Sequence, residues 1–332
     1  MNIFSVQKIT KIDPLYHLRS SLLNLWLIAG LYVDGWSHEH GKPLVTFFTP
    51  WHAFFYAGFF AVALFLMYPT LRNFFHYRQL KLFYPAYYLT AVIGLIIFGL
   101  GGIGDVIWHG FYGFEKQIDA ILSPTHLGLY VGMFLIFIAP FNAIRQQKQI
   151  PYSLKNTFTL ILFATIIFSF FSFLTQYANP LISPFAFSTH KTGINYYGQT
   201  IGLVSLFIHL TFLLTPLLLV ISRYRLPFGS LTFIFTVNAI GMTAIHDHFD
   251  YIISAFLAGV LSDLILLKLL SKKRYYEILF SIFVPIIYSA FYFLIGYSTR
   301  GIWWSGYLVL GAIALSGFLG FSLYLFSLAS RR

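Results

Sequence analysis

Two stretches of this chain repeat one arrangement of residue types that bind metal ions in proteins. Each has an aspartate, a histidine four positions later, a loop, and then Ser or Thr, Pro, any residue and a second histidine. A tyrosine and a glycine follow at matching spacing, as Tyr56 and Gly58 and as Tyr130 and Gly132. The candidate ligands are Asp34, His38 and His52 in the first copy and Asp105, His109 and His126 in the second.

The spacing within each copy predicts three ligands around one point. Residues four apart share a face of a helix, so Asp34 and His38 can point at a common atom. Thr49 suits a helix N-cap and Pro50 the first helical position, which places His52 in the first turn of the next helix. The positive end of the helix dipole disfavours an imidazolium there, and neutral imidazole is the form that binds metal. One carboxylate and two imidazoles leave a position open to water or substrate, and they suit copper, zinc or non-haem iron.

Either copy alone also fits a structural role, because Asp and His at helix ends can hydrogen-bond across a loop. The recurrence of six ligand-type residues favours metal binding instead. A third polar cluster, formed by His246, His248 and Asp250, lies between two later helices. It could complete one of the metal sites or form a lid, or it could be a polar turn that hydrogen-bonds its own backbone.

The elements that must position these residues are membrane helices. Hydrophobic residues make up 58% of the 332 residues and charged residues only 9%, whereas roughly 25% of a soluble protein is charged. Apolar runs of about 20 residues, each long enough to span a bilayer core, recur along the chain. We therefore predict an all-α, polytopic integral membrane protein with a single transmembrane domain over 1–332. It has repeat-like hairpins at 20–69 and 83–144, and its remaining helices at 150–328. The predicted helices are 20–37, 50–69, 83–107, 124–144, 156–177, 199–221, 230–246, 251–270, 277–297 and 303–328.

The net charge of +11 is explained by topology. All but four of the 21 Lys and Arg residues fall in termini and loops on one side of the predicted helices; the exceptions are Lys42, Lys116, Lys191 and Arg300. By the positive-inside rule, both termini are then cytoplasmic. The candidate ligands lie on the extracytoplasmic side of a plasma (inner) membrane. The expected partner is the lipid bilayer and not a nucleic acid.

The Asp-x3-His spacing followed by a second histidine resembles the motif of the copper-site membrane subunit of particulate methane and ammonia monooxygenases. The resemblance covers the two short hairpins. It carries over to Asp34, His38 and His52 and, with a longer loop, to Asp105, His109 and His126. It implies copper bound between membrane helices and a metal-dependent oxidoreductase. Segments 223–229 and 257–263 also resemble polytopic bacterial membrane proteins, a likeness that implies no function.

The leading hypothesis is a monooxygenase-like oxidoreductase that acts on a small apolar substrate at the outer face. Its cofactor would be a transition metal, copper first and iron or zinc as alternatives. The sequence has no cysteine and no haem or flavin motif, so a partner subunit or quinol would donate the electrons. The alternatives are a transporter for a metal ion or small solute, and a non-catalytic subunit that holds metal or assists assembly. Coupled transport needs ionisable groups through the membrane depth, where the predicted inner helix halves carry few beyond Asp263 and His209.

Overall fold

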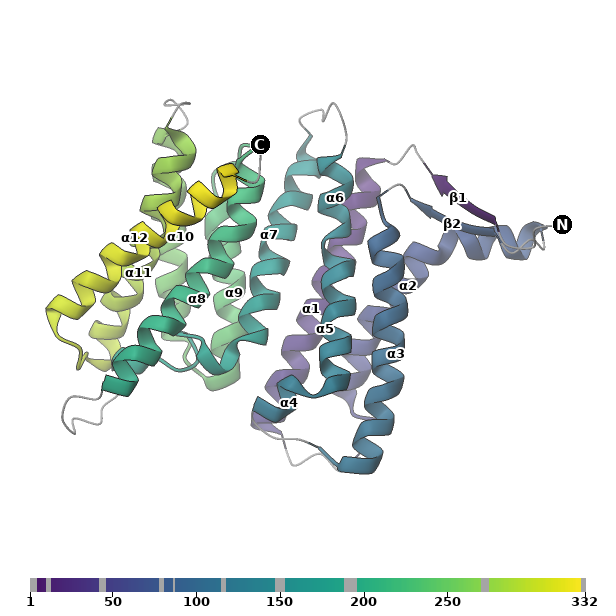
Figure 1. The fold of residues 1–332 in the computed structure, drawn as a ribbon, viewed down its shortest axis with the longest axis horizontal. Helices are drawn as coiled ribbons and strands as arrows, with labels where there is room; N and C mark the ends of the chain where they lie inside the picture. The colour runs from purple at the N-terminus through teal and green to yellow at the C-terminus, as the bar shows by residue number, and fades with distance from the viewer. Residues whose placement is uncertain are drawn as a thin grey trace. The chain divides into compact units, whose positions relative to one another are not determined.

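The structure is a computed structural model that describes residues 5–9, 13–41, 46–77, 81–85, 87–114, 118–146, 153–187, 196–269 and 275–329. The chain divides into two compact units, Met1–Ile167 and Phe168–Arg332. Nearly all of the described residues lie in helices (Figure 1). Eight of these helices are long and apolar enough to cross a membrane. The protein is therefore helical and has the character of a polytopic membrane protein.

Two long helical hairpins form the N-terminal unit (Figure 1). In the first hairpin α1 packs against α2, and in the second α3 packs against α5. A parallel pair of strands, β1 and β2, lies beside the end of α2. The elements are β1 (Ser5–Ile9), α1 (Pro14–His40), α2 (Pro50–Tyr77), β2 (Lys81–Pro85), α3 (Leu89–Tyr112), α4 (Ile118–Leu122), α5 (Pro124–Phe137), α6 (Ala139–Arg145) and the first part of α7 (Leu154–Leu174).

Glycines in each hairpin, among them the glycine of the repeated pattern, let the two helices approach closely. A Cβ on Gly58 of α2 would lie 3.1 Å from the Cα of Leu27 in α1. A Cβ on Gly132 of α5 would lie 2.7 Å from the backbone nitrogen of Phe98 in α3. Helices in lipid associate largely through such close van der Waals packing at small residues. The glycine of the repeated sequence pattern is thus a packing residue in both hairpins.

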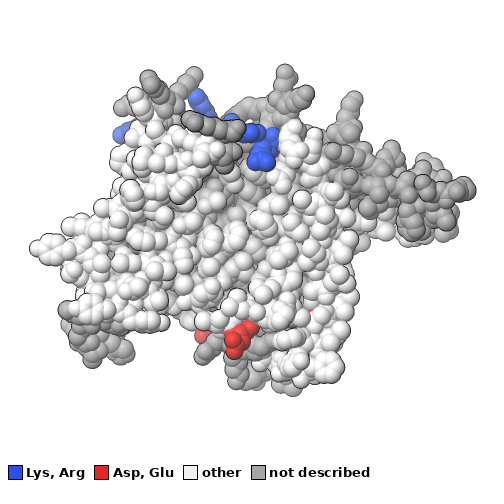
Figure 2. Space-filling model, viewed as in Figure 1, with Lys and Arg blue, Asp and Glu red and all other residues white. Residues whose placement is uncertain are grey.

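The charged side chains of the N-terminal unit lie towards its two ends. Arg145 ends α6 and Asp119 begins α4, and Figure 2 shows blue and red surface at these opposite ends. The helices between them expose large apolar side chains, among them Phe60, Leu64 and Leu100. This distribution suits a bundle whose middle contacts lipid hydrocarbon.

The C-terminal unit contains the rest of α7 and five further long helices. Within it α10 packs against α9 and α11, and α12 packs against α11 and α8. The fully buried Asp263 of α10 accepts hydrogen bonds from the backbone nitrogens of Leu231 (3.1 Å) and Thr232 (2.9 Å), so its carboxylate caps the start of α9. The elements are two 3-10 turns, Gln176–Ala178 and Phe185–Phe187, and α8 (Tyr196–Ile221), α9 (Ser230–His246), α10 (Asp250–Leu269), α11 (Tyr276–Arg300) and α12 (Gly306–Ala329).

Each predicted range contains a helix, and the differences have physical causes. The prediction that a helix begins at residue 83 is wrong, because β2 occupies Lys81–Pro85. A short apolar run does not distinguish a strand from a buried helix. The predicted helix 124–144 is divided at Ile138, because Pro140 has no N–H for the helical ladder. Within the described ranges, and with α5 and α6 taken as one segment (Pro124–Arg145), eight helical segments are long and apolar enough to cross a membrane, fewer than the ten predicted: α1 is not among them, and α9 has only 17 residues.

Candidate metal centre

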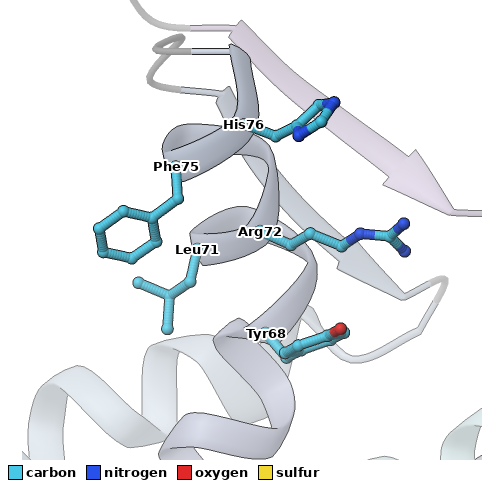
Figure 3. A pocket seen from close by; sticks show the side chains of 5 residues that line it. All are labelled: Tyr68, Leu71, Arg72, Phe75 and His76. Carbon is cyan, nitrogen blue, oxygen red and sulfur yellow. The ribbon is translucent and has the colours of Figure 1, made fainter.

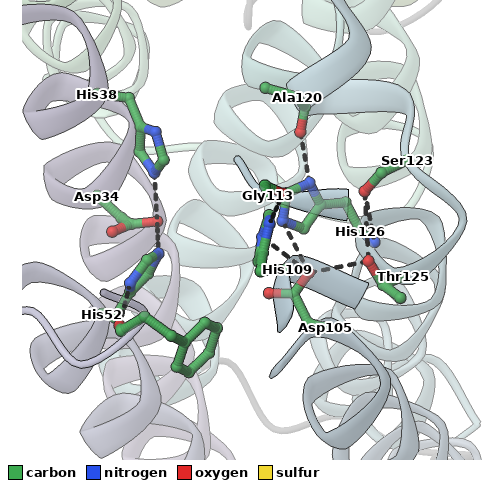
Figure 4. Close-up of polar contacts among 11 residues, drawn as sticks. Asp34, His38, His52, Asp105, His109, Gly113, Ala120, Ser123, Thr125 and His126 are labelled. Atoms are coloured by element: carbon green, nitrogen blue, oxygen red, sulfur yellow. Dashed lines mark hydrogen bonds and ion pairs between the residues drawn. The ribbon is translucent and has the colours of Figure 1, made fainter. Parts of the chain in front are cut away.

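The end of α1 and the start of α2 bring the first candidate ligand set together (Figure 4). The Nε2 atom of His52 lies 3.4 Å, and that of His38 lies 3.7 Å, from the same oxygen, Oδ2 of Asp34. Thr49 caps α2 as predicted, since its Oγ1 accepts a hydrogen bond from the backbone nitrogen of His52 (3.1 Å). We call Asp34, His38 and His52 the first triad.

The second hairpin builds the same arrangement from α3 and α5. The Nε2 atoms of His126 and His109 lie 3.2 Å and 3.4 Å from Oδ1 of Asp105. Ser123 is the N-cap of α5, as predicted, and accepts from the backbone nitrogen of His126. The side chain of Asp105 is only 3% exposed, so its carboxylate is almost removed from water and needs a compensating positive charge. We call Asp105, His109 and His126 the second triad.

Main-chain carbonyl groups fix which nitrogen carries the hydrogen in three of the four histidines. Nδ1 of His52 lies 2.7 Å from the carbonyl oxygen of Phe47, and Nδ1 of His109 lies 2.9 Å from that of Gly113. Nδ1 of His126 contacts the carbonyl oxygen of Ala120. A carbonyl oxygen only accepts hydrogen bonds, so Nδ1 is the donor in each imidazole. In the neutral ring, Nε2 then carries the lone pair that binds metal, and this lone pair faces the aspartate.

The distances within the triads fit a metal ion held between these groups. An imidazolium paired with a carboxylate has an N to O distance of about 2.7–2.9 Å. The four distances here are 3.2 to 3.7 Å. A metal ion bound at about 2.0–2.1 Å holds tetrahedral ligands about 3.3 Å apart. Each triad can therefore hold a metal ion with one coordination position open.

Several supporting residues were not anticipated from the sequence. The Oγ1 atom of Thr125 donates a hydrogen bond to Oδ1 of Asp105 (2.8 Å) and so orients that carboxylate. Thr125 is the variable residue of the Ser-Pro-x-His pattern, so its place next to His126 could have indicated a supporting role. Phe47 lies in a loop, Gly113 at the end of α3 and Ala120 in the short helix α4, where no periodic pattern marks the carbonyl groups.

One aromatic side chain lies next to both triads. The ring of Phe47 stacks on His52, with centroids 4.8 Å apart, and lies 6.3 Å from the ring of His109. The Tyr56 ring lies 5.8 Å from Phe47. Within the described part of the chain, the Tyr56 hydroxyl and Oδ1 of Asp34 are buried and have no hydrogen-bond partner. The described protein therefore leaves the hydrogen-bonding capacity of these two atoms unused.

The third predicted cluster lies in the C-terminal unit and does not form a triad. Asp250 pairs with Arg300, whose Nη2 lies 2.6 Å from Oδ1, and accepts a hydrogen bond from Thr299. Nδ1 of His248 lies 3.1 Å from the carbonyl oxygen of Leu181, and the rings of His246 and His248 are 6.3 Å apart. Burial lowers the pKa of His248, which favours the neutral ring. In the described ranges, His246, His248 and Asp250 do not converge as the two triads do.

Comparisons of the chain with protein families, with curated proteins and with solved structures gave no match. The functional argument therefore rests on the geometry of the two triads.

Proposed function

We propose that this protein is a membrane-embedded metalloprotein in which each triad binds a transition metal, copper first and iron or zinc as alternatives. The observation that carries the proposal is that the Nε2 atoms of two histidines in each triad face one carboxylate oxygen at 3.2 to 3.7 Å. A bound copper or iron ion would supply redox chemistry at the open coordination position. The proposed activity is that of a metal-dependent oxidoreductase, similar to the monooxygenases whose copper motif the two hairpins resemble.

The surroundings of the triads suit a small apolar substrate. Phe47 and the ring of Tyr56 supply an apolar surface next to both triads. In this proposal the Tyr56 hydroxyl and Oδ1 of Asp34, which have no partner in the described residues, offer hydrogen bonds to a polar atom of the bound molecule. In this proposal the triads lie on the extracytoplasmic side, both termini are cytoplasmic, and a partner subunit or a quinol donates the electrons.

Coupled transport is the weaker alternative, because the inner ionisable groups have structural partners. The carboxylate of Asp263 caps α9. His209 is held between the Asn179 amide (3.2 Å at Nδ1) and the Tyr288 hydroxyl (2.7 Å at Nε2). The Leu181 N–H donates to the amide oxygen of Asn179, so the amide nitrogen is the group that faces His209. Both nitrogens of the His209 ring are thus satisfied without a transported ion.

Metal analysis of the purified full-length protein tests the proposal. After incubation with copper and removal of loose ions, we expect two bound equivalents. His52→Ala should remove one equivalent, His109→Ala the other, and the double variant both. His40→Ala is the matched control, since His40 is exposed on the same end of α1 and bonds to the Trp36 carbonyl oxygen. Wild-type protein that retains neither copper, iron nor zinc after reconstitution overturns the proposal.

Catalysis is separated from metal storage by a second measurement. The metal-loaded protein is given a short-chain hydrocarbon, oxygen and a reduced quinol, and oxidised product is quantified. Product that disappears in the His52→Ala or His109→Ala variant supports an oxidoreductase. Stable metal binding without product, in the presence of the electron donor, favours a protein that only holds metal.

A further inference from the structure

The last part of α2 is a feature that neither triad uses. Pro69 follows His52 by 17 positions, which is roughly 25 Å of helix and close to the thickness of a hydrocarbon core, about 30 Å. The helix nevertheless continues to Tyr77, and Figure 1 shows its end turned away from the bundle beside β1 and β2. Proline inside a helix removes one backbone donor and is the usual cause of such a bend. The segment after Pro69 thus begins near the depth at which a straight span would leave the hydrocarbon.

Side chains on this segment are sorted by polarity around the helix. Figure 3 shows Leu71 and Phe75 on one side and Tyr68, Arg72 and His76 on the other. All five are exposed, with Phe75 at 69% and Tyr68 at 61%. They line a shallow hollow of about 470 Å³. A helix with this separation lies along a membrane surface, with its apolar side in the acyl region and its polar side at the headgroups.

The polar side has the chemistry of a phosphate site. Tyr68, Arg72 and His76 follow one another at four-residue steps, so their polar ends lie along one side of the helix. As far as the chain is described, no carboxylate pairs with Arg72. A guanidinium group matches a phosphate through two parallel hydrogen bonds, and a phenol hydroxyl can donate one more. The exposed Leu71 and Phe75 on the adjacent side suit a phosphate that is attached to hydrocarbon chains.

We propose that Tyr68, Leu71, Arg72, Phe75 and His76 form a binding site for the headgroup of an anionic phospholipid. Arg72 pairs with the phosphate, Tyr68 and His76 flank it, and Leu71 and Phe75 insert among the acyl chains. The site is separate from the triads and does not depend on their metal. It fixes the depth at which the end of α2 lies in the membrane.

Lipid binding by full-length protein in detergent tests this site. Fluorescent phosphatidylglycerol is titrated, and phosphatidylcholine with the same label serves as the neutral reference. Arg72→Gln should weaken phosphatidylglycerol binding about five-fold, the usual effect of one basic residue at an anionic surface, and leave phosphatidylcholine binding unchanged. Arg72→Lys should weaken phosphatidylglycerol binding less than Arg72→Gln does, because lysine keeps the positive charge. Arg19→Gln is the matched control, because Arg19 is also an exposed arginine near a helix end and should not alter either affinity.

Two further arms distinguish the source of the phosphate. Phe75→Ser with Leu71→Ser should weaken binding of the whole lipid. Glycerol phosphate, which carries the headgroup chemistry without acyl chains, should not displace the bound phosphatidylglycerol. The proposal is overturned if wild-type protein binds both lipids equally, if Arg19→Gln and Arg72→Gln have equal effects, or if glycerol phosphate displaces the lipid completely. Unchanged thermal unfolding of the variants shows that any loss is local.

Discussion

At the scale of single residues, the two triads differ in what holds their carboxylates. Thr125 donates to the triad oxygen of Asp105, whereas the corresponding residue of the first copy is Trp51, which has no hydroxyl group. Oδ1 of Asp34 has no hydrogen-bond partner in the described ranges. Groups that orient a ligand change metal affinity by about 10–100-fold. The second triad should therefore bind metal more tightly than the first.

This asymmetry gives a prediction for Thr125. Thr125→Val keeps the shape of the side chain but removes the hydroxyl, so the affinity of the second triad for copper should fall by about 10-fold or more. Thr125→Ser keeps the donor and should bind nearly as the wild type does. Both variants are made in a His52→Ala background, so that only the second triad binds metal. Their copper affinities are then measured by titration against a chelator of known affinity. Equal affinities for Val and Ser would show that the hydroxyl has no part in metal binding.

At the scale of helices, Gly132 is one of the glycines that let α3 and α5 pack closely. A Cβ on Gly132 meets the backbone of α3 at 2.7 Å, whereas a Cβ on Gly128, one turn earlier, has its nearest neighbour at 3.7 Å. Gly132→Ala should therefore push α3 and α5 apart and destabilise the protein by about 1–3 kcal/mol. Gly128→Ala, the control, should be nearly neutral. Thermal unfolding followed by circular dichroism measures the stability of both variants. Equal losses of stability in the two variants would contradict the packing argument.

Helices and triads were predictable from the sequence because both depend on short-range periodicity. Long apolar runs marked the helices, and the four-residue spacing of Asp105 and His109 with the cap at Ser123 marked the triad. The strand β2 and the extension of α2 beyond Pro69 were not predictable, since they depend on pairing with a distant segment and on what surrounds a proline. The carbonyl group of Phe47 was missed for a related reason, because a loop's path has no period.

At the scale of the whole molecule, the distribution of basic residues predicts the orientation of the chain. The protein has no cysteine, so a single introduced cysteine reports one position. His40→Cys and Phe249→Cys should react with an impermeant maleimide added to intact cells. Arg225→Cys should react only after the membrane is opened. All three positions are exposed, so accessibility depends on the side of the membrane. Labelling of Arg225→Cys and Phe249→Cys from the same side would show that α9 does not cross.

Each triad takes all its ligands from one hairpin: residues 34 to 52 for the first and 105 to 126 for the second. This locality has a consequence for biosynthesis. The first ligand set is complete once residue 52 has left the ribosome, and the second once residue 126 has, well before the C-terminal unit is made. In the proposed metalloprotein, a metal ion would then bind while synthesis continues and would hold the two helices of each hairpin together. The order of metal loading would follow the order of translation.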